Sequence, residues 1–206
     1  MLLPERGVRV SWSFWLFVLL AAAISPLTIV LSVLLAAALH ECGHLAALRA
    51  FRVPVEGLRL SALGAVLYAR GAQRLSYGRE LIVTLAGPAA NLLCGFLTAL
   101  IALRLAWVDG FVLAGAHLLL AAFNLLPVAP LDGSRTLYLA AAFFFGPAVG
   151  DAVTAIAGFA VSLTLLGAAV WLCAETGGGY FFLFAALVLF TGSIRQLSLA
   201  KNVIRV

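Results

Sequence analysis

Six long apolar segments alternate along the chain with short stretches that contain polar residues, glycine or proline. The segments cover approximately residues 11–25, 27–48, 80–106, 110–126, 150–173 and 180–199. An α-helix needs about 20 apolar residues to cross the hydrocarbon core of a bilayer, so the first and fourth segments are short and the others are long enough. Pro26, Asp109 with Gly110, and the glycines at 177–179 predict turns between segments. The pattern predicts an all-α membrane protein with six transmembrane helices, formed by residues 1–206 as a single domain.

The composition agrees with this pattern and argues against a soluble domain. Hydrophobic residues make up 65% of the 206 residues and charged residues 10%, whereas a typical soluble domain has about 25% charged residues. Lipid must therefore solvate the outer face in place of water. The formal net charge of +5 is spread between the apolar segments, which favours contact with anionic lipid over binding of nucleic acid.

The distribution of the basic residues predicts the orientation of the helices. If the N-terminus is cytoplasmic, the loop between the second and third segments is cytoplasmic too, and six arginines lie between residues 49 and 79. Arg104 is the one basic residue of the thirteen that then falls on the far side, near the end of its helix. Because cytoplasmic loops carry the excess of lysine and arginine, we expect a multi-pass protein of the cell membrane with both termini in the cytoplasm.

The segment between the second and third apolar runs has a different pattern. Residues 58–68 alternate partly between polar and apolar side chains, are interrupted by Gly64, and are too few and too basic to span a membrane. Partial alternation of this kind is typical of strands. The prediction is a short β-hairpin at the cytoplasmic interface, within residues 53–75, with an irregular loop as the alternative.

Three ionisable residues lie close together inside the second apolar helix, in the sequence His40-Glu41-Cys42-Gly43-His44. Such residues are costly inside a membrane and need an explanation. Residues four apart lie on one face of a helix, so both imidazoles can reach one metal ion. Glu41 is placed to act as a general base toward a water molecule. The pattern predicts a catalytic zinc site, with a polar patch between helices as the alternative.

A catalytic zinc ion needs a third protein ligand, and Asp132 is the candidate. The predicted topology brings it to the depth of His40, which lies about 20 Å from the far-side end of its helix at 1.5 Å per residue. Pro127 and Pro130 break the preceding helix, and broken helices at membrane depth are tolerated where they line a buried site or a wet cavity. Taken alone, Asp132 could instead be the N-cap of a following helix.

The third and fourth helices carry further polar residues. Gly87 and Pro88 predict close packing and a kink, and Asn91 then offers an amide to the interior, either to a substrate or as a polar contact between helices. His117 lies two turns before Asn124 on the same helix face. We interpret His117 as a hydrogen-bonded packing residue and not as a metal ligand.

The three motifs, in this order and on three separate membrane helices, resemble the site-2 protease family, and the layout looks most like its stage IV sporulation protein FB branch. They are His40-Glu41-x-x-His44, Gly87-Pro88-x-x-Asn91 and Asn124-x-x-Pro127-x-x-Pro130-Leu131-Asp132-Gly133. The resemblance covers nearly the whole chain. It implies Zn²⁺ bound by two histidines and an aspartate, a water activated by Glu41, and a role for Asn124 near the scissile peptide. Asn91, Pro127 and Gly133, from the same motifs, are further candidate substrate-binding residues.

The resemblance also sets expectations for partners. It implies that the protein cleaves a membrane or membrane-associated protein, which in that branch is a pro-sigma factor processed during sporulation. That branch commonly carries a C-terminal CBS domain and other branches insert a PDZ domain. This chain stops at Val206, just past the last predicted helix, so we expect no CBS domain, and the segments between the predicted helices leave no room for a PDZ domain. A membrane partner could supply the regulation, and no nucleic acid partner is expected.

Two other functions are compatible with histidines and an aspartate inside a membrane. A zinc transporter has no need for a glutamate beside the first histidine, and it needs a polar route, for which the last two helices supply few polar residues. A pseudoprotease would bind membrane segments without cleaving them, but Glu41 is intact. Zinc-dependent intramembrane proteolysis is therefore the favoured function, with a metal-handling protein or a pseudoprotease as the alternatives.

Overall fold

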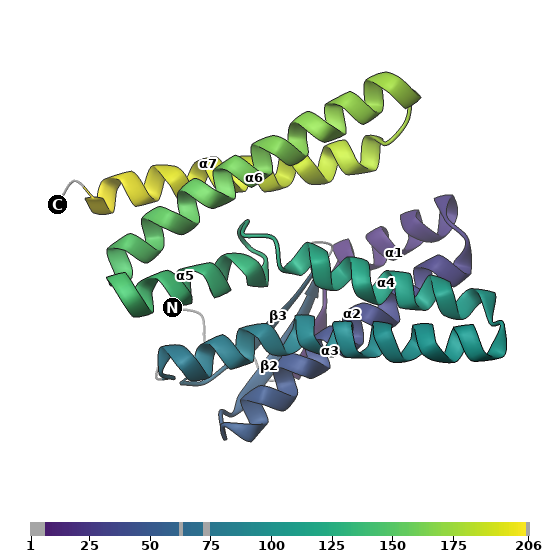
Figure 1. The fold of residues 1–206 in the computed structure, drawn as a ribbon, viewed down its shortest axis with the longest axis horizontal. Coiled ribbons are helices and arrows are strands. Elements are labelled where there is room, and N and C mark those ends of the chain that lie inside the picture. The colour runs from purple at the N-terminus through teal and green to yellow at the C-terminus, as the bar shows by residue number, and fades with distance from the viewer. Residues whose placement is uncertain (1–6, 62–63, 72–74, 205–206) are drawn as a thin grey trace. The chain divides into compact units, whose positions relative to one another are not determined.

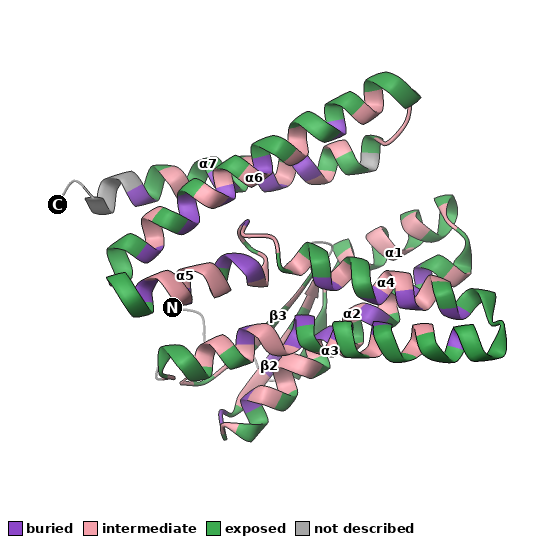
Figure 2. Ribbon diagram, in the orientation of Figure 1, coloured by how far each residue is buried: buried purple, intermediate pink, exposed green. Residues whose placement is uncertain are grey.

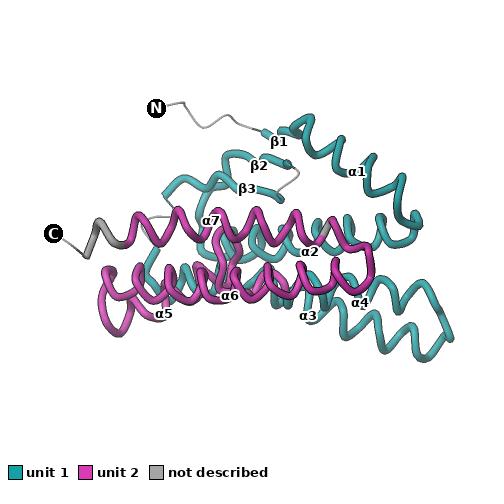
Figure 3. The backbone as a smooth tube through the Cα atoms, turned by 90° about the horizontal axis from the view of Figure 1, so that it is seen from above, with its two compact units in different colours: residues 1–122 teal, residues 123–206 magenta. Residues whose placement is uncertain are grey.

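The computed structural model describes residues 7–61, 64–71 and 75–204, which form two compact units, residues 1–122 and 123–206 (Figure 1, Figure 3). The elements of the first unit are β1 (Gly7–Val10), α1 (Trp12–Ile24), α2 (Leu27–Ala50), β2 (Val55–Ser61), β3 (Gly64–Ala69), α3 (Tyr77–Leu105) and α4 (Val108–Asn124), the last of which continues two residues into the second. The second unit contains α5 (Asp132–Phe145), α6 (Pro147–Thr176) and α7 (Tyr180–Ile204).

Six of the seven described helices coincide with the six predicted segments, to within a few residues at each end. Four of them contain spans long and apolar enough to cross a membrane, namely Leu27–Ala50, Tyr77–Leu105, Pro147–Thr176 and Phe182–Ala200. The other two, α1 and α4, are apolar but shorter, with 13 and 17 residues. The structure is thus that of a mostly helical protein with four candidate spans, and the total of six spans stays a prediction.

Two features of the helices differ from the prediction. The turn between α3 and α4 lies at Ala106 and Trp107, where Ala106 adopts a left-handed conformation with φ 51°, and not at Asp109 and Gly110. Asp109 instead lies in the first turn of α4, where a negative charge is favoured by the helix dipole. The helix α5 is additional to the six predicted segments, because its mixed polar and apolar residues do not form one long apolar run.

The predicted pairing of two strands is present, as part of a three-stranded sheet in the order β1-β2-β3. β2 and β3 pair antiparallel, with Arg59 opposite Val66 and Ser61 opposite Gly64. The strand β1 was not predicted; it pairs parallel to β2, with Gly7 opposite Gly57. The hairpin tip at 62–63, residues 72–74 and both chain termini lie outside the described residues, and the position of the sheet at a membrane interface stays a prediction.

Exposed positions run along most of the helices (Figure 2), and many of the exposed residues are large and apolar, whereas the buried residues include both polar and apolar ones. No residue of α1 is buried, and Trp12 is 90% exposed. The buried residues include nine polar or charged ones: Ser32, His40, Thr84, Asn91, His117, Ser134, Thr154, Ser162 and Ser193. The many large apolar residues exposed along the helices are unlike the surface expected of a protein solvated by water, and they suit helices solvated by lipid.

Candidate metal centre

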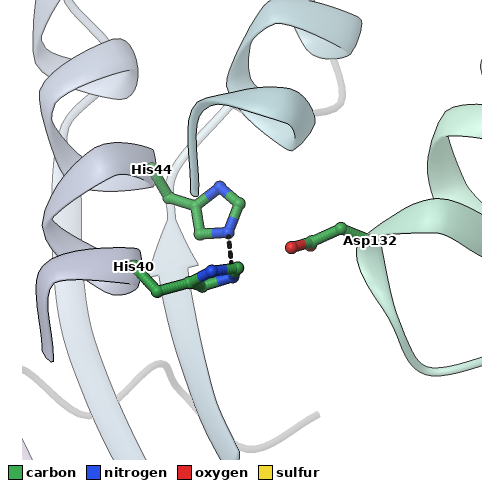
Figure 4. A group of neighbouring side chains, drawn as sticks. All are labelled: His40, His44 and Asp132. Atoms are coloured by element: carbon green, nitrogen blue, oxygen red, sulfur yellow. Dashed lines mark hydrogen bonds between the residues drawn. The ribbon is translucent and has the colours of Figure 1, made fainter. Parts of the chain in front are cut away.

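The two histidines of α2 point their Nε2 atoms at each other, 3.1 Å apart (Figure 4). They lie one helical turn apart, with their rings at 78°. Two nitrogens that each bind one tetrahedral zinc at about 2.0–2.1 Å are separated by about 3.3 Å. The spacing and direction of the His40 and His44 nitrogens therefore fit a shared metal ion.

The other ring nitrogen of His44 fixes the tautomer of that residue. Its Nδ1 lies 2.8 Å from the backbone oxygen of Val83 on α3. A carbonyl oxygen can only accept, so Nδ1 carries the proton and donates it. In the neutral ring Nε2 then holds a lone pair, which is the form that binds a metal ion.

The other ring nitrogen of His40 contacts a buried amide. The Nδ1 of His40 lies 3.2 Å from Nδ2 of Asn91, and the Oδ1 of Asn91 lies 3.0 Å from Nδ1 of His117 on α4. The three residues are 5%, 0% and 1% exposed, respectively. The helices α2, α3 and α4 are thus joined by one line of hydrogen bonds. His117 is a hydrogen-bonded packing residue, as predicted, and Asn91 makes the polar contact between helices that was its alternative interpretation.

Two glycines permit α2 and α3 to approach closely at this site. A Cβ atom added to Gly43 would meet the backbone oxygen of Ala86 and lie 2.9 Å from the Cβ of Ala90. A Cβ added to Gly87 would meet Nε2 of His44 and lie 2.7 Å from Nε2 of His40. Gly87 therefore leaves open the space beside the two facing Nε2 atoms, because any larger residue would fill it.

The remaining predicted site residues lie on α2 and around the non-helical segment between α4 and α5. Glu41 is half-buried on α2, directly after His40. α4 ends at Asn124, and residues 125–131, with Pro127 among them, are not helical, so the predicted break is present. Asp132 is the first residue of α5 and is half-buried.

Gly133 has a packing role that the sequence did not reveal. A Cβ at this position would meet the backbone oxygen of Leu125 and lie 2.5 Å from that of Leu126. Gly133 is thus required by the compact turn that precedes Asp132. His40 and His44 offer imidazole nitrogens and Asp132 offers a carboxylate oxygen, which are donor types found in zinc enzymes.

The fold is shared with a solved structure of a protease. The Site-2 Protease from Methanocaldococcus jannaschii superposes with a TM-score of 0.67, over 96% of this chain and 94% of that chain, at 19% sequence identity. At this level of identity the likeness establishes the fold.

The sequence is similar to curated proteins from Mycobacterium tuberculosis. The chain is 32% identical over 169 residues to "Putative zinc metalloprotease Rip3" of strains Erdman and H37Rv. The match includes 75% of this chain and 42% of the relatives, so the chain spans less than half the length of the curated proteins it matches. No family model matches the chain.

Proposed function

We propose that this chain is a zinc-dependent membrane protease of the site-2 protease family, which hydrolyses a peptide bond in or near a membrane segment of a protein substrate. The observation that carries the proposal is the pair of facing Nε2 atoms of His40 and His44 inside an apolar helix, with Glu41 beside them. The fold shared with a site-2 protease and the sequence likeness to Rip3 support it.

The ligands in this proposal are His40, His44 and Asp132. The hydrogen bond from Nδ1 of His44 to the oxygen of Val83 leaves the lone pair on Nε2. Asp132 lies at the start of α5, directly after the non-helical segment that follows α4. Bound zinc would supply Lewis acidity, polarising a carbonyl oxygen and lowering the pKa of a water molecule toward about 7.

Glu41 is the proposed general base. One of its carboxylate oxygens accepts a proton from the attacking water and then passes that proton to the nitrogen of the leaving amine. The atoms balance, because the water oxygen becomes part of the new carboxyl group and both of its protons end on the products. In the proposal Asn124, with Pro127 and Gly133, positions the scissile peptide, since these residues form or shape the end of α4 and the turn before Asp132.

The substrate in this proposal is held in an extended form along β3. The backbone nitrogen of Arg70 donates to the oxygen of Pro54, so the N–H groups of β3 that alternate with it, including that of Val66, point toward β2. The N–H of Leu67 then points to the other edge of β3, on which no strand of the described residues lies. An open edge of this kind accepts an added strand, and it would keep the substrate peptide out of a helix, in which its carbonyls are already bonded.

The finer parts of the proposal rest on the motifs and the charge pattern. The motif order supports membership of the stage IV sporulation protein FB branch, with a membrane-associated protein such as a pro-sigma factor as the substrate. The distribution of arginines supports six spans, cytoplasmic termini and an active site toward the cytoplasm. A regulatory membrane partner would act on the cytoplasmic side, where the proposed active site lies.

The decisive experiment combines zinc analysis with cleavage of co-expressed single-span substrates. We expect about one zinc per wild-type chain, and loss of most of it in His40→Ala, His44→Ala and Asp132→Ala. Glu41→Gln should keep its zinc but lose cleavage by about 10²–10⁴-fold, because glutamine cannot accept the proton. Glu175→Gln, at the exposed C-terminal end of α6, is the matched control and should cleave normally.

The outcomes separate the proposed function from its alternatives. A transporter would keep its zinc flux in Glu41→Gln, and a pseudoprotease would cleave no substrate even as the wild type. Cleavage by Glu41→Gln at the wild-type rate would refute the mechanism, and full zinc content in Asp132→Ala would refute the third ligand.

A further inference from the structure

The line of hydrogen bonds from His40 through Asn91 to His117 ends beside the proposed metal centre. We infer that Asn91 and His117 are positioning residues that set which nitrogen of His40 carries its proton, and thereby whether His40 can bind the metal ion. This inference rests on the proposed function only in taking His40 and His44 as zinc ligands.

The positions of nitrogen and oxygen atoms define the four links of this line of hydrogen bonds. From α4 to α3 it runs through Nδ1 of His117, the amide of Asn91, the ring of His40 and the ring of His44, and it ends at the backbone oxygen of Val83. The four links measure 3.0, 3.2, 3.1 and 2.8 Å. Only the last link has a direction set by its atoms, since the carbonyl of Val83 must accept.

Two directions of donation are compatible with these positions, because an amide oxygen and nitrogen have nearly the same outline. With Nδ2 of Asn91 toward His40, the amide donates to Nδ1 of His40. The proton of the neutral His40 ring is then on Nε2, where it is donated to Nε2 of His44. Every link is satisfied, but the Nε2 of His40 has no lone pair for a metal ion.

The opposite orientation prepares the site for zinc. With Oδ1 of Asn91 toward His40, the oxygen accepts the proton of Nδ1, and the lone pairs of both Nε2 atoms face each other. A cation between them removes the repulsion of these lone pairs. The Nδ2 group then donates to Nδ1 of His117, so the proton of His117 moves to its own Nε2.

Metal binding is therefore coupled to rotation of the Asn91 amide and to the tautomer of His117. The coupling is strong because the amide is fully buried and each of its two ends has one histidine partner. Loss of a partner would leave a buried polar group without a bond, which is unfavourable in a medium of low polarity. The outer hydrogen bond of a histidine ligand generally holds its tautomer and ring orientation.

The test is the zinc affinity of the full chain in detergent, measured by chelator competition. Asn91→Leu should bind zinc about 10–100-fold more weakly, as expected for loss of an outer partner of a metal ligand. Asn91→Asp should bind zinc as tightly as the wild type or more tightly, because a carboxylate can only accept and so keeps the proton of His40 on Nδ1. His117→Phe should weaken binding less than Asn91→Leu, since His40 retains its amide partner.

Two further measurements distinguish positioning from general structural damage. The visible spectrum of the Co²⁺-substituted protein should change in Asn91→Leu and return toward that of the wild type in Asn91→Asp. Ser162→Ala, which removes a buried hydroxyl from α6, is the control and should leave both readouts unchanged.

Wild-type zinc affinity in Asn91→Leu, or an affinity in Asn91→Asp as weak as that of Asn91→Leu, would overturn the inference. If Asn91→Leu does not fold, the zinc affinities of Asn91→Asp and His117→Phe are compared instead. Weaker zinc binding by Asn91→Asp than by His117→Phe would then overturn the inference. Absence of zinc from the wild type would instead refute the proposed function itself. Because the test measures zinc affinity and not cleavage, it shows whether Asn91 and His117 are positioning residues without knowledge of the substrate.

Discussion

The buried residues His40, Asn91 and His117 of α2–α4 and the buried serines Ser162 and Ser193 of α6 and α7 satisfy their hydrogen bonds in different ways. In the first group, His40, Asn91 and His117 each depend on a partner from another helix. In the second, Ser162 and Ser193 bond to each other at 2.7 Å, and each hydroxyl also reaches a carbonyl of its own helix, at Phe159 and Phe190.

The difference follows from side-chain chemistry. A serine hydroxyl is short enough to donate to the preceding turn, so it is satisfied wherever its helix lies. An imidazole or amide farther from the backbone has no such local partner, and its bonds exist only when the neighbouring helices are in place. The interior of α2–α4 therefore depends on one arrangement of helices, whereas the α6–α7 pair tolerates the loss of its polar contact.

The largest effect that tests this comparison is expected from Gly87→Ala. The added methyl group would occupy the space beside the Nε2 atoms of both histidines. We expect zinc content to fall to near that of His44→Ala and cleavage to be lost with it. Both are measured on the purified chain, by metal analysis and with a co-expressed substrate.

Gly115→Ala on α4 is the matched control, because a Cβ added there meets no atom within 4 Å. It makes the same chemical change in the same unit and should leave zinc content and cleavage unaltered. Equal zinc content in Gly87→Ala and Gly115→Ala would show that the interior of α2–α4 tolerates an added methyl group as well as the open position at Gly115 does.

A second test separates the polar interior of the first unit from its sheet. Leu67→Pro removes the backbone donor that points to the outer edge of β3, so a substrate strand would lose one bond there. We expect slower cleavage with unchanged zinc content, whereas Val66→Pro should disrupt the β2–β3 pairing as well and impair cleavage further. Leu67→Ala retains the donor and is the control. If Leu67→Pro cleaves as fast as Leu67→Ala, the edge of β3 does not hold the substrate.

The same contrast explains how far the sequence could predict the molecule. An apolar segment long enough to span a membrane is recognisable from its own residues, so the sequence predicts the helices to within a few residues. The motif of His40, Glu41 and His44 is equally local, because one helical turn brings its residues together. In both cases the information lies within a few neighbouring residues.

Contacts between residues far apart in the sequence leave no local pattern from which they can be predicted. Pairing of Gly7 with Gly57 depends on the fold, and a strand of four residues carries too little pattern to be recognised. His117 and Asn91 were each recognised as buried polar residues, but no local signal shows that they meet each other and His40. Likewise, the turn at Ala106 needed no glycine or proline, so Asp109 and Gly110 were mistaken for it.

The smallest effect is expected from removing the serine pair of α6 and α7. Ser162→Ala deletes the 2.7 Å contact with Ser193 and the 3.0 Å contact with the carbonyl of Phe159, yet Ser193 keeps its bond to the carbonyl of Phe190 and is left satisfied. Polar contacts between membrane helices contribute on average about 0.6 kcal/mol, so the free energy of unfolding in detergent should fall by about that amount, and Ser193→Ala should give a similar value. A double-mutant cycle of the two changes measures the coupling directly. Zinc affinity should stay at the wild-type level in all three variants, because α6 and α7 hold their polar pair for packing alone. A loss of zinc affinity in Ser162→Ala comparable to that of Asn91→Leu would mean that the two polar interiors act as one, and the distinction drawn between them would be wrong.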